Sequence, residues 1–113
     1  MEITKRKNVP WQTLDSSDGW RVGLLGYCKR FSRVGELERH NLTREAFVLV
    51  KGEATVHVAD KDLKVSSLAM EIGNIYTVDR GEWHHITVSK DALVVVIESS
   101  DTSQENTDII TFA

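Results

Sequence analysis

The sequence predicts an all-β fold in which short antiparallel strands form a sandwich or a barrel. Two observations lead to this expectation. Most segments are short and rich in β-branched or aromatic residues, and turn signals such as Lys51-Gly52 and Arg80-Gly81 separate them. Many short strands at such spacing are typical of antiparallel sandwiches and barrels. The expected strands cover residues 20–27, 36–40, 45–51, 53–59, 62–68, 74–78, 83–88 and 92–98.

Turn signals follow these strands in order along the chain. Asp18-Gly19 precedes the first strand, and Lys51-Gly52 joins the third to the fourth. The later strands are delimited by residues 59–61, 73–74, 80–81 and 89–91. A short polar C-terminal tail, residues 99–107, is expected to hold one helical turn capped by Asp101 or Ser103.

Composition restricts the classes of protein to consider. We expect the 113 residues to form one domain, residues 1–113, with a core of its own. The net charge of −3 argues against nucleic acid as a partner, because the phosphate backbone favours a basic surface. Cys28 is the only cysteine, which excludes an intramolecular disulfide and a cysteine-rich zinc knuckle. Because we see neither a signal peptide nor an apolar run of membrane-spanning length, we expect a cytoplasmic protein without a membrane partner.

Ionisable side chains cluster where residues 36–40 lead into residues 45–51. Side chains alternate between the two faces of a strand, so Glu38 and His40 point the same way. A tight connection after His40 would return the chain at Glu45, on the same face as Phe47. A carboxylate at the end of such an inward row is costly to desolvate without a partner. Glu45 therefore needs a cation, a hydrogen-bond donor or water.

The strand 83–88 offers the missing partner. His84 and His85 are expected on opposite faces, and His84 shares its face with Ile86 and Val88. If this face lines the interior, Glu38, His40, Glu45 and His84 converge. Such nitrogen and oxygen ligands suit one divalent ion of iron, manganese, zinc, nickel or copper. The alternative is a buried polar network in which the imidazoles bridge the glutamates without a metal.

These two segments resemble the paired motifs of the cupin superfamily, the RmlC-like jelly rolls. The residues that match the first motif are Glu38, His40, Glu45 and Gly52, with glutamate in the position of its first histidine. The residues that match the second motif are Gly73, Gly81 and His84, with Asp79 in the place of its proline. The resemblance covers about residues 20–98 and implies a double-stranded β-helix, the cupin-type jelly-roll barrel, with the site inside its mouth.

Two classes of function remain open. One is a metalloenzyme that acts on a small polar molecule, for which the resemblance implies chemistry of the oxygenase, isomerase or sugar-modifying type. The other is a metal-free small-molecule-binding module or isomerase-like site with His40 or His84 as the base. For substrate binding we name Phe47, Tyr76 and Arg44 as candidates. The alternatives are that Phe47 and Tyr76 simply fill the barrel and that Arg44 is a solvated turn residue, which the base rate for exposed arginines favours. The residue types alone indicate neither the catalytic residues nor the substrate.

The remaining expectations concern histidines and assembly. We expect His57 to be partly exposed and His85 to lie at the surface or at an interface. The tryptophans, Trp11 among them, are expected to supply core or interface area rather than a stacking platform. The segment 3–14 contains a proline that suits an edge strand, and cupins commonly dimerise through sheet extension. We therefore predict a homodimer, with a monomer as the alternative.

Overall fold

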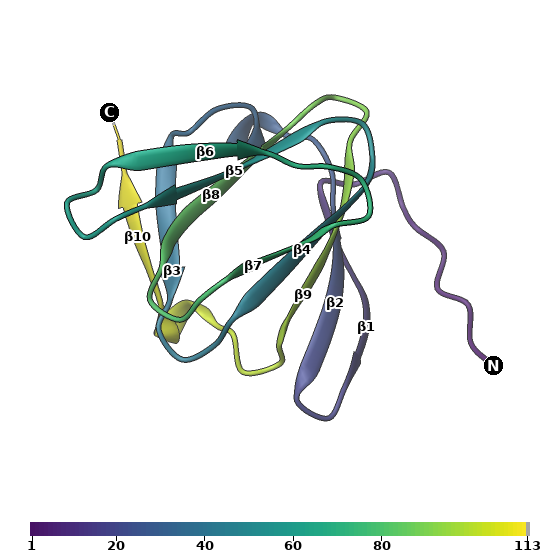
Figure 1. The fold of residues 1–113 in the computed structure, drawn as a ribbon. Coiled ribbons are helices and arrows are strands. Elements are labelled where there is room, and N and C mark those ends of the chain that lie inside the picture. Colours follow the sequence, from purple (N-terminus) through teal and green to yellow (C-terminus); the bar gives the residue numbers. More distant parts are fainter. Residues whose placement is uncertain (113) are drawn as a thin grey trace.

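The chain forms two antiparallel sheets of five strands each (Figure 1), in a computed structural model that describes residues 1–112. The first sheet has the order β1 (Trp11–Ser17), β2 (Trp20–Leu25), β9 (Leu93–Ser99), β4 (Glu45–Lys51) and β7 (Ile75–Val78). The second has the order β10 (Thr107–Thr111), β3 (Glu36–His40), β8 (Trp83–Val88), β5 (Ala54–Ala59) and β6 (Val65–Ala69). Sequence neighbours are often not sheet neighbours, as expected for a jelly roll.

Helical structure among residues 1–112 is limited to two short 3-10 helices, η1 (Lys29–Phe31) and η2 (Gln104–Asn106). The second forms the turn expected in the tail, and Ser103 and Asn106 close a capping box around it. In the described part of the chain, neither helix has the length or the apolar character needed to cross a bilayer.

The all-β prediction is confirmed, and every expected strand is present with slightly different ends. Two strands were not predicted, β1 and β10. The sequence of β1 is largely polar and breaks its alternation at a bulge between Thr13 and Asp15. The strand β10 is short and lies directly after the polar tail, yet it pairs with the whole of β3. Both are edge strands, where pairing on one side alone tolerates a weak pattern.

The hydrophobic core lies between the two sheets and is built from alternating residues of the central strands. Phe47 and Leu49 of β4, Val94 and Val96 of β9, and Ile86 of β8 are all nearly inaccessible to solvent. Burying side chains of this size contributes roughly 1.5–3 kcal/mol each. This packing also fixes the register of the strands, because a slip by one residue would turn each row outward.

The same rows place polar groups at one end of the core. In β4 the inward row Phe47–Leu49 continues to Glu45, and in β9 the row Val94–Val96 continues to Glu98. The register pairs Glu45 directly with Glu98. Alternation in neighbouring strands therefore carries two carboxylates into a buried position.

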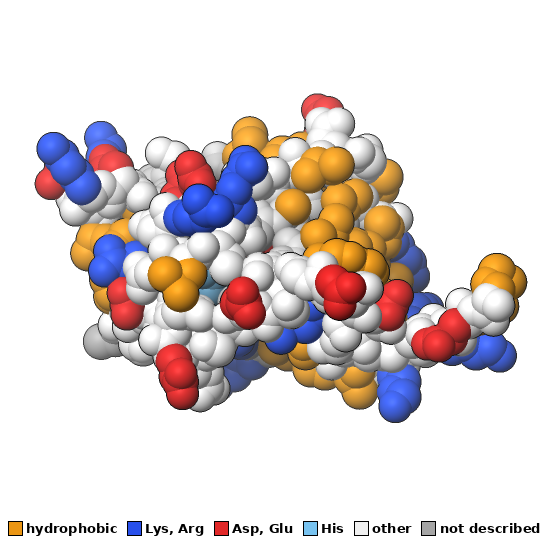
Figure 2. Space-filling view, turned by 90° about the horizontal axis from the view of Figure 1, so that it is seen from below, with side chains coloured by type: hydrophobic (Ala, Val, Ile, Leu, Met, Phe, Trp, Pro, Cys, Tyr) orange, Lys and Arg blue, Asp and Glu red, His pale blue; other side chains and the backbone are white. Residues whose placement is uncertain are grey.

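The N-terminal segment lies outside this arrangement. Residues 1–10 form neither strand nor helix, are exposed, and project away from the barrel in an extended course (Figures 1 and 2). Pro10 accepts a hydrogen bond from the backbone of Gly26, and strand pairing begins at Trp11, which pairs with Leu25. The packed domain therefore begins at β1.

Candidate functional site

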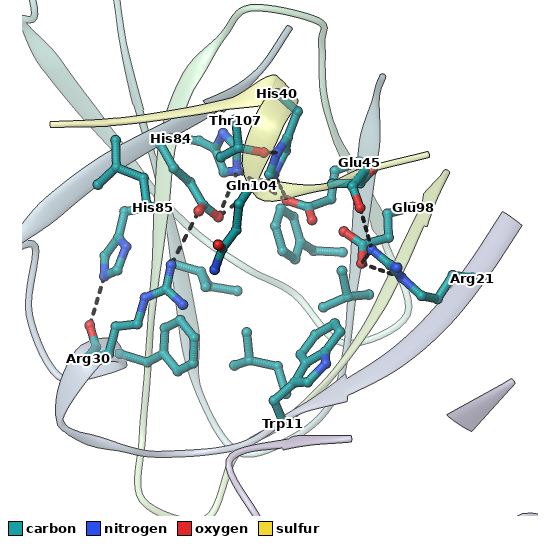
Figure 3. A pocket seen from close by; sticks show the side chains of 18 of the residues that line it. Trp11, Arg21, Arg30, His40, Glu45, His84, His85, Glu98, Gln104 and Thr107 are labelled. Carbon is teal, nitrogen blue, oxygen red and sulfur yellow. Dashed lines mark hydrogen bonds and ion pairs between the residues drawn. The ribbon is translucent and has the colours of Figure 1, made fainter. Parts of the chain in front are cut away.

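Three strands bring the four predicted ligand residues together. Glu38 and His40 come from β3, Glu45 from β4 and His84 from β8. Each residue offers one nitrogen or oxygen atom, and these atoms lie within 4.8 Å of one another. The two sheets thus meet at this cluster (Figure 3), because β3 and β8 belong to one sheet and β4 to the other.

The short distances in this cluster all join an imidazole nitrogen to a carboxylate oxygen. His84 Nε2 lies 3.1 Å from Glu45 Oε1 and 3.7 Å from Glu38 Oε1. His40 Nε2 lies 3.5 Å from Glu45 Oε1 and 3.8 Å from Glu38 Oε1. Both nitrogens and both oxygens therefore face one common point. His40, Glu45 and His84 are buried, and Glu38 is partly exposed.

The hydrogen bond on the far side of His84 defines its tautomer. His84 Nδ1 lies 3.0 Å from the carbonyl oxygen of Glu82, and a carbonyl can only accept, so Nδ1 carries a proton. In the neutral ring, Nε2 then presents a lone pair to Glu45 Oε1, which is also an acceptor. Two acceptors in this position repel each other unless a second proton or a cation lies between them.

His40 has a similar arrangement. Its Nδ1 lies 2.8 Å from the hydroxyl of Thr107, whereas its buried Nε2 has no hydrogen-bond partner within residues 1–112. A buried polar atom without a partner costs free energy. In metal sites a ligating histidine typically holds a hydrogen bond on its other ring nitrogen, as both His40 and His84 do. The donor set and the orphaned nitrogen therefore fit a divalent cation.

The charged groups of the cluster lower the pKa of Glu45 and raise the pKa of His40. Burial opposes ionisation of Glu45, but the imidazoles of His40 and His84 outweigh it and hold the pKa of Glu45 well below its ordinary value. Burial likewise opposes protonation of His40, yet Glu45 and Glu38 raise its pKa above the ordinary value. Without a metal, the cluster therefore favours ionised Glu45 facing a protonated imidazole.

A further carboxylate, Glu98, lies behind Glu45. Arg21 Nε donates a hydrogen bond to Glu98 Oε1 at 2.9 Å, and Arg21 Nη2 forms an ion pair with the same oxygen at 2.7 Å. Burial and the neighbouring Glu45 nevertheless raise the pKa of Glu98 to about 7, against the opposing effect of Arg21. Glu98 follows Val94 and Val96 in the inward row of β9, so alternation within that strand could have identified it from the sequence.

The cluster forms one wall of a cavity of about 690 Å³, a volume typical of small-molecule sites. Apolar side chains from both sheets and from η1 also line the cavity. Residues that sequence reasoning did not assign to a site also line it, namely Trp11, Thr13, Arg21, Leu25, Arg30, Phe31, His85, Ile86, Val96, Glu98, Thr102, Ser103, Gln104, Thr107 and Ile109. Most of these residues are far in sequence from the motifs, so no local pattern marks them.

The three candidate substrate-binding residues have different positions. Phe47 lines the cavity and lies 6.2 Å from His84 between ring centroids. Tyr76 packs against the core, and its hydroxyl accepts a hydrogen bond from the backbone of Glu71, away from the cavity lining. Arg44 is exposed and lies 3.8 Å from Asp79. The role of all three in substrate binding stays a prediction.

The structure corrects the expected exposure of two histidines. His57 is buried, and its ring nitrogens lie 2.7 Å from Ser67 Oγ and 2.8 Å from Thr87 Oγ1. His85 is buried rather than at the surface, and its Nε2 donates to the carbonyls of Arg30 and Arg33 at 3.0 and 3.1 Å. The loop around η1 packs against β8 and covers this side of the strand, which sequence alternation alone does not reveal. His85 is not a member of the four-residue cluster, as expected.

Solved structures with similar architecture identify the fold. A variant of Streptomyces PAC13 with uridine has a TM-score of 0.69 and 10% sequence identity, over 96% of this chain and 86% of that chain. A mutant of Bacillus subtilis oxalate decarboxylase has a TM-score of 0.62 and 17% identity, over 87% of this chain and 26% of that chain. KdgF from Halomonas sp. has a TM-score of 0.62 and 12% identity, over 83% and 84%.

This chain has the cupin fold. The neighbours are cupin-fold proteins, and the two antiparallel sheets match their jelly roll. No protein-family model and no curated protein matches the sequence. At these identities the likeness establishes the architecture of the cupin domain, whereas its chemistry has to be argued from its own side chains.

Proposed function

We propose that this cupin binds one divalent metal ion through Glu38, His40, Glu45 and His84, and that its cavity holds a small polar molecule beside that ion. The main support is the arrangement of the two Nε2 atoms. His84 Nε2 carries a lone pair in the neutral ring, His40 Nε2 has no partner in the described chain, and both face carboxylate oxygens. A shared cation satisfies all four groups at once.

The chain's own residues hold the ligands in position. The carbonyl of Glu82 fixes the ring of His84, and the hydroxyl of Thr107 fixes the ring of His40. A bound metal would supply Lewis acidity and orient an oxygen-bearing ligand in the cavity. If the protein is an enzyme, we propose that it catalyses a reaction of the oxygenase or isomerase type. The similar structures include an oxalate decarboxylase, an oxalate oxidase with glycolate and PAC13 with uridine, which all concern small polar molecules.

A metal-free site is the second candidate, and one distance favours it. His84 Nε2 and Glu45 Oε1 are 3.1 Å apart, which suits a hydrogen bond from a protonated imidazole. The raised pKa of His40 points the same way, although burial opposes it. In this case the cavity would be a binding module, or His40 or His84 would transfer protons as an acid and base.

Metal analysis distinguishes the two candidates. Protein purified without chelator, then incubated separately with iron, manganese, zinc or nickel, is passed through gel filtration and analysed by mass spectrometry for metals. We expect close to one ion per chain, and we expect the conservative variants Glu45→Gln and His84→Gln to lose it while keeping the wild-type circular dichroism. A wild-type protein that retains none of these metals would contradict the proposal and favour the metal-free site.

We also propose that residues 1–113 act as one cytoplasmic domain and as a homodimer. The dimer is supported by the segment 1–10, which extends from the barrel and carries the exposed apolar residues Ile3 and Val9. An extended arm of this kind can pair with an edge strand of a second copy.

A further inference from the structure

The inward face of β2 has a gap in its row of side chains, and Trp11 fills it. Arg21, Gly23 and Leu25 are the inward residues of this strand, because they pair with the buried Glu98, Val96 and Val94 of β9. Gly23 has no side chain to contribute. Trp11 of β1, which pairs with Leu25, reaches over to the position that Gly23 leaves open.

Contact between the indole and Gly23 is close. A Cβ atom on Gly23 would lie 2.2 Å from Cη2, 2.4 Å from Cζ2 and 2.9 Å from Cζ3 of Trp11. Real Cβ atoms essentially never approach other atoms so closely. Glycine is therefore required at position 23 for the benzo ring of Trp11 to rest on the backbone of β2.

This tryptophan borders the cavity rather than the core. Trp11 lines the cavity together with Leu25, Phe31 and Val96, and 40% of its surface is exposed. In Figure 3 the indole lies on the side of the pocket opposite His40 and Thr107. A flat ring supported from behind by backbone and open in front is suited to stacking against another flat ring.

The cavity also has charged groups in its lining. Its charged lining groups are the carboxylates of Glu38, Glu45 and Glu98 and the guanidinium groups of Arg21 and Arg30. With neutral histidines, the formal sum of these charges is negative. A divalent cation at the cluster makes this sum positive, which favours an anionic oxygen of a ligand beside the ion.

We propose that Trp11, seated on Gly23, determines the specificity of the cavity and selects small carboxylates that carry a flat ring. The carboxylate would lie toward the metal and the ring against the indole. The preference for a carboxylate rests on the metal site proposed above, whereas the preference for a flat ring rests on Trp11 and Gly23 alone.

Three carboxylates that differ in the group attached to the carboxyl carbon test this proposal on the zinc-loaded protein. Acetate has no ring, cyclohexanecarboxylate has a puckered ring and benzoate has a flat ring. By calorimetry we expect benzoate to bind about tenfold more tightly than acetate, in line with stacking on an aromatic side chain. Cyclohexanecarboxylate should lie between them. In ¹⁵N–¹H spectra, benzoate should shift the indole signal of Trp11 more than those of Trp20 and Trp83.

Three variants test whether the indole of Trp11 is responsible for the benzoate preference. Trp11→Leu removes the flat surface but keeps an apolar side chain, and Gly23→Ala displaces the indole without changing it. Trp20→Leu is the control, because Trp20 is also 40% exposed but does not line the cavity. The benzoate preference should disappear in Trp11→Leu, weaken in Gly23→Ala and persist in Trp20→Leu. If Trp11→Leu does not fold, the proposal is tested by the benzoate preference of Gly23→Ala and by the shift of the Trp11 indole signal in the wild type.

Failure of this inference can be separated from failure of the metal proposal. If zinc binds but benzoate and acetate bind equally, or neither binds, the inference is wrong and the metal site stands. If zinc does not bind, the metal proposal is wrong, and the neutral pair benzamide and acetamide then tests the ring on the metal-free protein. Equal binding of that pair overturns the role of Trp11 as well. Tighter binding of benzamide, lost in Trp11→Leu, keeps that role and removes only the carboxylate preference.

Discussion

Arg30 and Glu38 form an ion pair in which the two oxygens of the carboxylate have different partners. The guanidinium of Arg30 lies 3.2 Å from Glu38 Oε2, whereas Glu38 Oε1 faces His40 and His84. Arg30 also contacts Glu36 at 2.6 Å, so two carboxylates hold its side chain in place. Arg30 thereby orients one oxygen of Glu38 toward the cluster.

The first prediction follows from this pair. Arg30→Ala should weaken metal binding about tenfold or more, because partners that orient ligands commonly contribute that much. Competition with a chelating dye would measure the change. Arg39→Ala is the control, since Arg39 of β3 likewise forms an ion pair, but with Asp108 instead of a cluster residue. Equal losses in the two variants would show a general effect on β3 rather than orientation of Glu38.

The second prediction is that the adjacent residues His84 and His85 have different roles. His85→Ala should leave the metal content unchanged, because His85 lies outside the four-residue cluster. It should still lower the free energy of unfolding by about 1–3 kcal/mol, since the carbonyls of Arg30 and Arg33 would lose the donor that the buried His85 ring provides. Metal analysis and urea unfolding measure the two effects. Loss of metal in a folded His85→Ala protein would contradict this division.

The third prediction concerns pH and His57. Burial, with a smaller contribution from His85, lowers the pKa of His57 below 6.5 in the folded protein. The unfolded chain therefore binds a proton first as the pH falls, and stability should decrease from about pH 6.5 downward until the folded-state pKa is passed. His85, whose pKa is also lowered by burial, adds to this slope.

His57→Gln tests this effect, because glutamine does not titrate. Urea unfolding of the metal-free protein between pH 5 and pH 8 should give a smaller loss of stability in the variant than in the wild type. Metal-free protein is needed in both cases, since metal binding has its own pH dependence. Parallel curves for the two proteins would mean that His57 is not responsible for the slope.

The fourth prediction is the dimer. Light scattering should give about twice 12.8 kDa for the full chain and a monomer for a variant lacking residues 1–8. The deletion ends before Trp11, so β1 and the cavity keep their residues. A full-length mass near 12.8 kDa would rule out the dimer. A dimer that survives the deletion would place the interface on other exposed apolar side chains, such as Val50, Ile75 and Ile97.

Strand alternation accounts for how much of the site could be predicted. Glu38, His40, Glu45 and His84 stand in strong strands beside buried apolar residues, so their faces followed from the sequence. Arg30 could not be placed, because it belongs to the loop around η1, whose course depends on tertiary packing. Trp11 was expected in core or interface area rather than as a stacking platform. Its position over Gly23 could not be predicted, because it depends on the register of β1 with β2. Long-range registers of this kind leave no local signal.

The hydrogen bond between Thr107 and His40 has a practical consequence for how the domain should be expressed. A fragment cut to the motif-bearing residues 20–98 would keep all four cluster residues but would lose Thr107, Gln104 and the strand β10 that pairs with β3. Such a fragment would also lack β1. Expression vectors should therefore retain the C-terminus through Thr111, and any affinity tag there should follow a flexible spacer so that the last strand can pair undisturbed.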